Sequence, residues 1–345
     1  ANTLKARDNV PILGWVSLNG RCRFCSLPIS RRYPIVESLV GLTLTIIGIT
    51  QIYGLSLPWQ TVHAHEALLW APRFTQTSLA ILTYHGVAMG TLWAMTLIRM
   101  DGTRLPIKLV AFSTVAVLAP LLVYPTAMVV PWQAHRPPGW TPDGLYVDAV
   151  MRVTTALVAA ALIGRVLAKG LCPSADLKLD PLGRGAARLV DLIAMLSIPA
   201  IVIGWQSMPA LVIMAAILTP ILQPLLGAIP INDGPHGQIH HRGKLESFVF
   251  ALPFALTLHL VFWRMLWNTW FWPSDQSSPN VIIVAGLLVL LIPIFLKEPK
   301  SDRSMMVESK EPDGESESGS DELPQHHGDG ESDDRNHGGN DAPGP

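Results

Sequence analysis

The chain has 345 residues, of which 49% are hydrophobic and 15% are charged, and its formal net charge at pH 7 is −1. Soluble domains carry about 25% charged residues, so this composition favours a membrane protein. A net charge near zero argues against nucleic acid as a partner. Three cysteines are too few for a disulfide framework.

Residues 1–34 precede the first apolar stretch and contain Cys22 and Cys25 as a CxxC. No cleavable signal peptide is recognisable there. Because the chain begins at Ala1 rather than at a methionine, we expect that an upstream segment is missing. The sequence therefore predicts a small cysteine-bearing segment in front of the membrane domain.

Apolar stretches long enough to cross a bilayer fill most of residues 35–297, since a crossing needs about 20 apolar residues. The tract 189–226 is too long for one crossing, and we expect two helices with a turn near 204–209. Pro120 and Pro125 are expected to kink the third span, and Arg152 and Arg165 to reach the interface from the fourth. The expected spans are 35–53, 78–98, 109–131, 149–167, 189–226, 248–266 and 281–296. We predict an all-α, polytopic transmembrane bundle with about seven crossings, give or take one.

Basic residues gather in alternate connections, which the positive-inside rule assigns to the cytoplasm. The opposite connections carry few basic residues and are rich in tryptophan, typical of the membrane interface. We therefore expect the N-terminal segment and the C-terminal tail to be cytoplasmic. The basic residues are Arg21, Arg23, Arg31, Arg32, Arg99, Arg104, Lys108, Lys169, Lys178, Arg184, Arg188, Arg242, Lys244, Lys297, Lys300 and Arg303, and the tryptophans are Trp59, Trp70, Trp132 and Trp140.

Residues 298–345 consist mainly of Ser, Asp, Glu, Gly and His, with almost no large apolar side chains. Such a segment cannot bury enough surface to fold, so we predict a disordered acidic tail. It is either an interaction segment or a solvated tail without a role.

Two groups of residues suggest metal binding. Cys22 and Cys25 would supply two of the four ligands that a structural zinc takes, which makes the pair alone a weak signal. His236 and His240 are four residues apart, but Gly and Pro around them disfavour a helix and favour a solvated loop. His85 and His259 fall within expected spans, so we expect them to face the bundle interior in structural hydrogen bonds.

The most specific stretch of the chain lies just before the first span. It reads DNVPILGW at 8–15, GRCRFC at 20–25 and PISRRYPIVE at 28–37. This run resembles the N-terminal domain of the bacterial prepilin peptidases, the type IV leader peptidases or A24 membrane aspartic proteases. In that family an earlier CxxC joins this one in binding zinc. The resemblance thus implies that Cys22 and Cys25 are half a zinc site, and that the first helix and the other half would precede Ala1.

The resemblance also implies an activity. Family members cleave the leader peptides of type IV pilin and pseudopilin precursors at the cytoplasmic face of the bacterial inner membrane. Many also N-methylate the new N-terminus from S-adenosylmethionine, which we expect here only if that activity is retained. Cleavage needs two aspartates, because one ionised carboxylate activates water while a protonated one polarises the peptide carbonyl.

The first aspartate is Asp101. The run from Leu97 to Leu109 resembles the family's stretch in which a DxD leads into Leu-Pro-Asp, and Asp101 matches the second Asp of the DxD. Arg99 stands where the first Asp is expected, and Ile107 where the Asp after proline is expected. Without the resemblance, Asp101 and Gly102 would be read as a simple turn.

The second aspartate belongs in a Gly-x-Gly-Asp-x-Lys-Leu run, which this chain matches only in part. Ser174–Leu179 keeps the Asp-x-Lys-Leu half around Asp176 but lacks both glycines, whereas Gly183–Leu189 keeps the glycines but has Ala186 in place of the aspartate. Asp191 opens the apolar helix that runs to Gly204 and Trp205. We select Asp176, with Asp191 as the alternative; the competing interpretation is that all of these are ordinary polar groups of a loop.

Three hypotheses follow. The first is a divergent prepilin peptidase that uses Asp101 and Asp176. The second is an inactive paralogue that serves as a membrane scaffold in pilus or type II secretion assembly, as Arg99, Ile107 and Ala186 suggest. The third is a small transporter, which the absence of recognisable inverted repeats disfavours.

Overall fold

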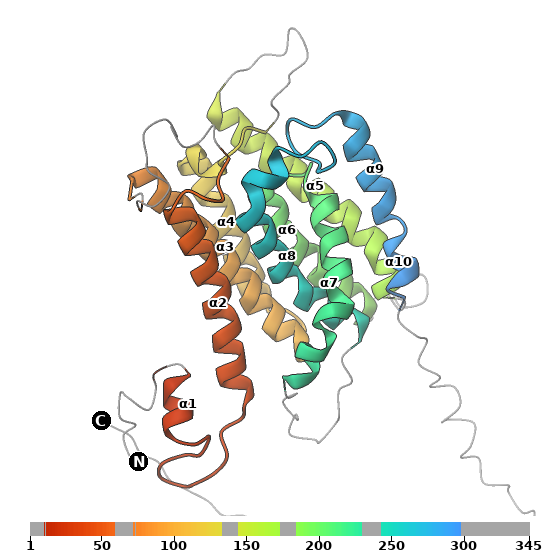
Figure 1. Ribbon diagram of the computed structural model, residues 1–345. Helices are drawn as coiled ribbons and strands as arrows, with labels where there is room; N and C mark the ends of the chain where they lie inside the picture. Colours follow the sequence, from red (N-terminus) through yellow and green to blue (C-terminus); the bar gives the residue numbers. More distant parts are fainter. Residues whose placement is uncertain are drawn as a thin grey trace, which may run out of the picture. The chain divides into compact units, whose positions relative to one another are not determined.

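The computed structural model describes residues 10, 12–58, 72, 74–132, 144–172, 184–229 and 243–297. Within these ranges the regular elements are all helical, and the one β-bridge joins Arg21 to Pro28 (Figure 1). The elements are α1 (Leu13–Ser17), α2 (Arg32–Ile52), α3 (Gln76–Met100), α4 (Ile107–Val123), the 3₁₀ helix η3 (Pro125–Met128), α5 (Leu145–Leu171), α6 (Arg184–Ile203), α7 (Met208–Ala228), α8 (Lys244–Trp267), α9 (Pro279–Val289) and α10 (Ile292–Phe295). The predicted all-α fold is confirmed.

Five helices, α2, α3, α5, α7 and α8, are long and apolar enough to cross a membrane, and α4 and Pro279–Phe295 are shorter apolar helices. With α6, each span expected from the sequence contains a helix. Counting Pro279–Phe295 as one helix, the expected segments hold eight α-helices in the described ranges, which is within the predicted seven, give or take one. An even number is also what the charge distribution requires, because only then do the two ends of the chain lie on the same side of the membrane.

Proline limits the third span. The sequence predicted a kinked span to residue 131, but α4 ends at Val123 and a short 3₁₀ helix begins at Pro125. Tyr124 is not helical (φ −132°, ψ 76°), because a residue before proline is driven away from the α region. Pro120 lies inside α4 without ending it.

The long apolar tract divides as predicted. α6 ends at Ile203, and α7 begins at Met208. Gly204 has a φ of +91°, a conformation that side-chain-bearing residues rarely adopt. The glycine thus permits the sharp reversal between two neighbouring spans.

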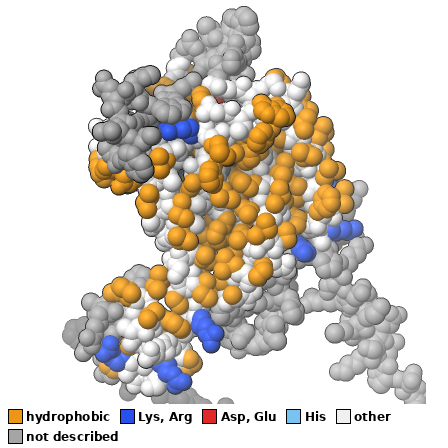
Figure 2. Space-filling view, in the orientation of Figure 1, with side chains coloured by type: hydrophobic (Ala, Val, Ile, Leu, Met, Phe, Trp, Pro, Cys, Tyr) orange, Lys and Arg blue, Asp and Glu red, His pale blue; other side chains and the backbone are white. Residues whose placement is uncertain are grey.

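Helix α8 is the centre of the bundle. It packs against α7, α3 and α2, and it is the most buried of the five long apolar helices, whereas the peripheral α2 is the least buried (Figure 1). Trp93 of α3 makes edge-on contacts with Phe250 and Phe254 of α8. Figure 2 shows apolar side chains covering the flank of the bundle, with most of the visible Lys and Arg near its lower end. This distribution suits a bundle surrounded by lipid.

The expectation for Arg152 is wrong. Its side chain does not reach the interface but is 1% exposed, and its Nη1 donates to the carbonyls of Met128 (2.8 Å) and Val202 (3.3 Å). Met128 ends η3 and Val202 lies in the last turn of α6, so these two elements hold one end of the guanidinium inside the protein. Arg165, by contrast, is exposed.

Candidate functional site

Asp101 lies directly after the last residue of α3. Its backbone N–H donates to the carbonyl of Ile98 (3.2 Å), and that of Gly102 donates to Arg99 (2.9 Å). Gly102 has a φ of +69°, which ends the helix in a tight turn. This turn therefore fixes the carboxyl of Asp101 at the end of α3.

Arg32 binds Asp101 through both of its terminal nitrogens. Nη2 donates to Oδ2 at 2.7 Å, and Nη1 donates to Oδ1. Arg32 is the first residue of α2 and belongs to the stretch at 28–37 that precedes the first span. The side chain of Asp101 is 24% exposed. The structure thus joins two distant sequence features in one bidentate ion pair.

Asp191 lies at the end of the second turn of α6 and is buried. Its Oδ2 accepts a hydrogen bond from the backbone N–H of Leu105 (3.4 Å) and lies 3.8 Å from Nη1 of Arg99. Asp101 and Leu105 are the two ends of one short loop, so Asp191 and Asp101 lie at the same end of the bundle. Neither of these two carboxyls is a hydrogen-bond partner of the other.

Arg99 links three helices through buried charges. Its Nη2 donates to Oε1 of Glu246 on α8 (3.1 Å), and its Nη1 donates to the carbonyl of Thr103 (3.0 Å). Oε2 of Glu246 in turn accepts from the N–H of Gly243 and so caps α8 (3.0 Å). A lone buried arginine would be costly, but the two carboxylates compensate its charge.

Cys22 and Cys25 lie in a small closed turn ahead of α2. The N–H of Cys22 donates to Leu27 and that of Ser26 donates to Cys22, both at 2.9 Å. Neither cysteine is in a disulfide, and Cys25 is exposed. These hydrogen bonds hold both cysteines in one short turn.

Comparison with known families matches residues 1–51 to the Bacterial Peptidase A24 N-terminal domain. Residues 1–51 are thus similar to the N-terminal domain of the A24 peptidases. This domain includes the cysteine turn, Arg32 and most of α2.

Curated relatives agree with this. A Prepilin leader peptidase/N-methyltransferase of Klebsiella pneumoniae is 33% identical over 101 residues, covering 29% of this chain and 43% of the relative. A Type 4 prepilin-like proteins leader peptide-processing enzyme of Escherichia coli O78:H11 is 47% identical over 47 residues (14% and 18%). A Prepilin leader peptidase/N-methyltransferase of Aeromonas hydrophila is 43% identical over 61 residues (18% and 20%). The chain thus spans less than half the length of these relatives. No solved structure matches it.

The described part of the A24 N-terminal domain does not complete a zinc site. Two thiols are half of the usual tetrahedral set. No group of three or more His, Cys, Asp or Glu side chains that could hold a metal occurs in the described ranges. The cysteine turn fits one half of a zinc site and no more.

Some predicted residues lie outside the described ranges. Asp176, His236 and His240 are among them, as is the tail from residue 298. Helix α6 begins at Arg184, so Ala186 lies in its first turn.

Sequence reasoning missed Arg32 and Glu246 as partners in this region. Glu246 carried a local signal, since it is three residues after Gly243 at the start of an apolar run, the position of a capping glutamate. Arg32 carried none, because its contact with Asp101 depends on how α2 packs against α3.

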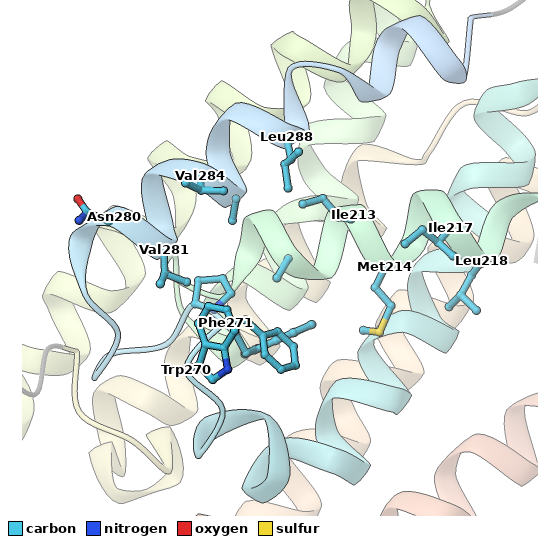
Figure 3. Close-up of a pocket in the computed structure, with 14 residues that line it drawn as sticks. Ile213, Met214, Ile217, Leu218, Trp270, Phe271, Asn280, Val281, Val284 and Leu288 are labelled. Atoms are coloured by element: carbon cyan, nitrogen blue, oxygen red, sulfur yellow. The ribbon is translucent and has the colours of Figure 1, made fainter.

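An apolar pocket of about 520 Å³ lies elsewhere, between α7, α9 and the connection before α9 (Figure 3). Ile213, Met214, Val284 and Leu288 line it, with Trp270 and Phe271 at one end. It contains none of the candidate carboxyls and offers no acid or base for hydrolysis.

Proposed function

We propose that this chain is a membrane aspartic endopeptidase of the prepilin peptidase type, which cleaves the leader peptides of type IV pilin or pseudopilin precursors. Cleavage would occur at the cytoplasmic face of the bacterial inner membrane, with Asp101 as one catalytic carboxyl. The observation that carries the proposal is the bidentate contact between Arg32 of the A24 N-terminal domain and Asp101. The contact joins the most specific part of the sequence to the aspartate that the resemblance implies.

Asp191 and Asp176 are the two candidates for the second carboxyl. The packing of Asp191 against Leu105 supports it, because the loop from Asp101 to Leu105 then lies beside both carboxyls. The surroundings of the two carboxyls differ. Asp101 is partly exposed and paired with Arg32, whereas Asp191 is buried beside Arg99. In this assignment Asp101 activates water once Arg32 turns aside. Asp191 first takes up a proton, which leaves Arg99 paired with Glu246, and then donates that proton to the peptide carbonyl.

The test is cleavage of a prepilin by membranes that contain each variant. Asp101→Asn removes the base without changing its shape, and Asp191→Asn and Asp176→Asn separate the two candidates for the acid. We expect Asp101→Asn and one of the other two to abolish processing. Asp148→Asn, in the first turn of α5 at the opposite end of the bundle, is the control and should process normally at equal membrane levels. Full activity of Asp101→Asn would refute the assignment.

A second candidate function is a non-catalytic scaffold for pilus or type II secretion assembly. The observation that favours it is that both oxygens of Asp101 are bound by Arg32, while Asp191 is buried beside Arg99. A scaffold would leave prepilin uncut at any level of the protein, so prepilin processing by the wild-type protein would exclude this second function. Transfer of a labelled methyl group from S-adenosylmethionine to the new N-terminus would test separately for methyltransferase activity.

A further inference from the structure

A second group of buried polar side chains lies in the half of the bundle away from Asp101. It consists of Tyr84 and His85 on α3, Arg152 on α5 and His259 on α8, all at most 3% exposed. His85 precedes Asp101 by 16 residues on the same helix, which separates them by about 24 Å at about 1.5 Å per residue. The proposed peptidase makes no use of these groups.

These side chains lie close to one another, with the ring centroids of Tyr84 and His85 5.6 Å apart. Arg152 interacts electrostatically with Tyr84, His85 and His259, and the two histidines interact with each other. The ring of Trp263 lies between them, with centroids 6.0 Å from His85 and 5.4 Å from His259. We call the group formed by Tyr84, His85, Arg152, His259 and Trp263 the outer chamber.

Several polar atoms of the outer chamber have no hydrogen-bond partner in the protein. They are the hydroxyl of Tyr84, Nε2 of His85, Nε of Arg152 and both ring nitrogens of His259. Nδ1 of His85 is bonded to Nε2 of Gln51 (2.7 Å), and Nη1 of Arg152 donates to the carbonyls of Met128 and Val202. Inside a membrane bundle, where bulk water is excluded, polar groups left without partners are strongly disfavoured.

The balance of donors and acceptors identifies the ligand. Nε of Arg152 is a donor, the hydroxyl of Tyr84 is both donor and acceptor, and a neutral His259 presents one of each. An anion would serve only the donors, and a metal ion only the acceptors. Asp148 and Asp275 also act electrostatically on Arg152, so its charge is countered without an anion. Water serves both kinds of atom.

We propose that the outer chamber binds a cluster of ordered water molecules that is closed off from bulk solvent. The waters bridge His259, Tyr84 and Nε of Arg152, completing the hydrogen bonds that the protein does not make. The chamber is thus a second polar site, distinct from the carboxyl region at the cytoplasmic end.

In situ radiolytic labelling of the full-length protein tests this, because radicals formed from bound water oxidise the side chains beside it. Trp263 is compared with Trp93, which is equally buried but whose indole N–H donates to Thr43 (3.0 Å) among phenylalanine rings. We expect Trp263 to be oxidised several times faster than Trp93. Radicals generated in bulk solvent from peroxide should label neither. Equal, background labelling of both in situ would overturn the proposal, as would labelling of Trp263 from bulk solvent.

The variant His259→Phe supplies a second measurement, because its Tm should change in opposite directions depending on whether the outer chamber contains water. Phenylalanine keeps a ring beside Trp263 and Trp272 but removes both nitrogens. Around a water cluster, the change removes hydrogen bonds, so the Tm and the labelling of Trp263 should both fall. In a dry chamber it removes two unsatisfied atoms, so a raised Tm with unchanged labelling would refute the proposal. Neither readout depends on peptidase activity.

Discussion

Arg32, the first residue of α2, binds both carboxylate oxygens of Asp101, which follows α3 sixty-nine residues later. The pair fastens the segment that matches the A24 N-terminal domain to the end of the second span. It also occupies the carboxylate that the proposed chemistry needs. Under the proposed function, Arg32 would have to release Asp101 before hydrolysis.

The coupling between Arg32 and Asp101 is the first prediction. Arg32→Gln and Asp101→Asn should each lower stability, and a double-mutant cycle should give a coupling of about 1–3 kcal/mol, because the pair is bidentate and largely buried. Thermal unfolding in detergent measures it. Additive single effects would mean that the contact contributes nothing.

Exchanging the two residues separates structure from chemistry. Arg32→Asp combined with Asp101→Arg restores an ion pair between α2 and the end of α3, so it should recover much of the lost stability. It leaves no carboxylate at position 101, so prepilin cleavage should stay absent. Cleavage by the exchanged protein would show that Asp101 only holds the segment in place.

The buried charges around Arg99 give a prediction about stability. Arg99→Met leaves Glu246 and Asp191 without their cation and should destabilise the protein by about 3–5 kcal/mol. Arg165→Met, on the exposed face of α5, is the matched control and should change stability by less than about 0.5 kcal/mol. Equal effects in denaturant unfolding would mean that the buried cluster is not a structural link.

The sequence predicted the helices well because the bilayer demands long apolar runs, and this requirement is local. The turn at Gly204 was also predicted, whereas at Pro125 the sequence predicted a kink and not the break that the structure shows. The burial of Arg152 was not predictable, because it depends on which backbone carbonyls pack against α5. For an arginine two turns into a span, reaching the interface and being buried are both compatible with the sequence.

The candidate site was predictable only in pieces. Asp101 could be found because a run of neighbouring residues fixes its register. Its partner Arg32 and the linkage of Arg99 to Glu246 could not, because they join helices far apart in sequence. Arg99 looked like a lost aspartate, whereas in the fold it is the cation for two buried carboxylates.

A substitution at Gly204 tests whether the turn between α6 and α7 requires glycine. Gly204 has a φ of +91°, and a Cβ there would lie 2.9 Å from Nη2 of Arg152 and 3.1 Å from Oε1 of Gln206. Gly204→Ala should therefore destabilise the protein by about 1–3 kcal/mol. Gly90→Ala, inside α3 with open space around it, should be neutral or stabilising by up to about 1 kcal/mol. A thermal shift that does not separate the two variants would contradict the strained turn.

Thiol labelling tests the membrane orientation. Cys25 is exposed, whereas Cys172 is buried at the end of α5. If the basic connections are cytoplasmic, a membrane-impermeant maleimide should modify Cys25 in inverted vesicles and not in intact spheroplasts. A cysteine introduced at Leu145, which is exposed at the opposite end of α5, should show the reverse pattern. Labelling of Cys25 in intact spheroplasts would put the A24 N-terminal domain and Asp101 on the outer face, away from a cytoplasmic prepilin leader, and the peptidase proposal would then fail.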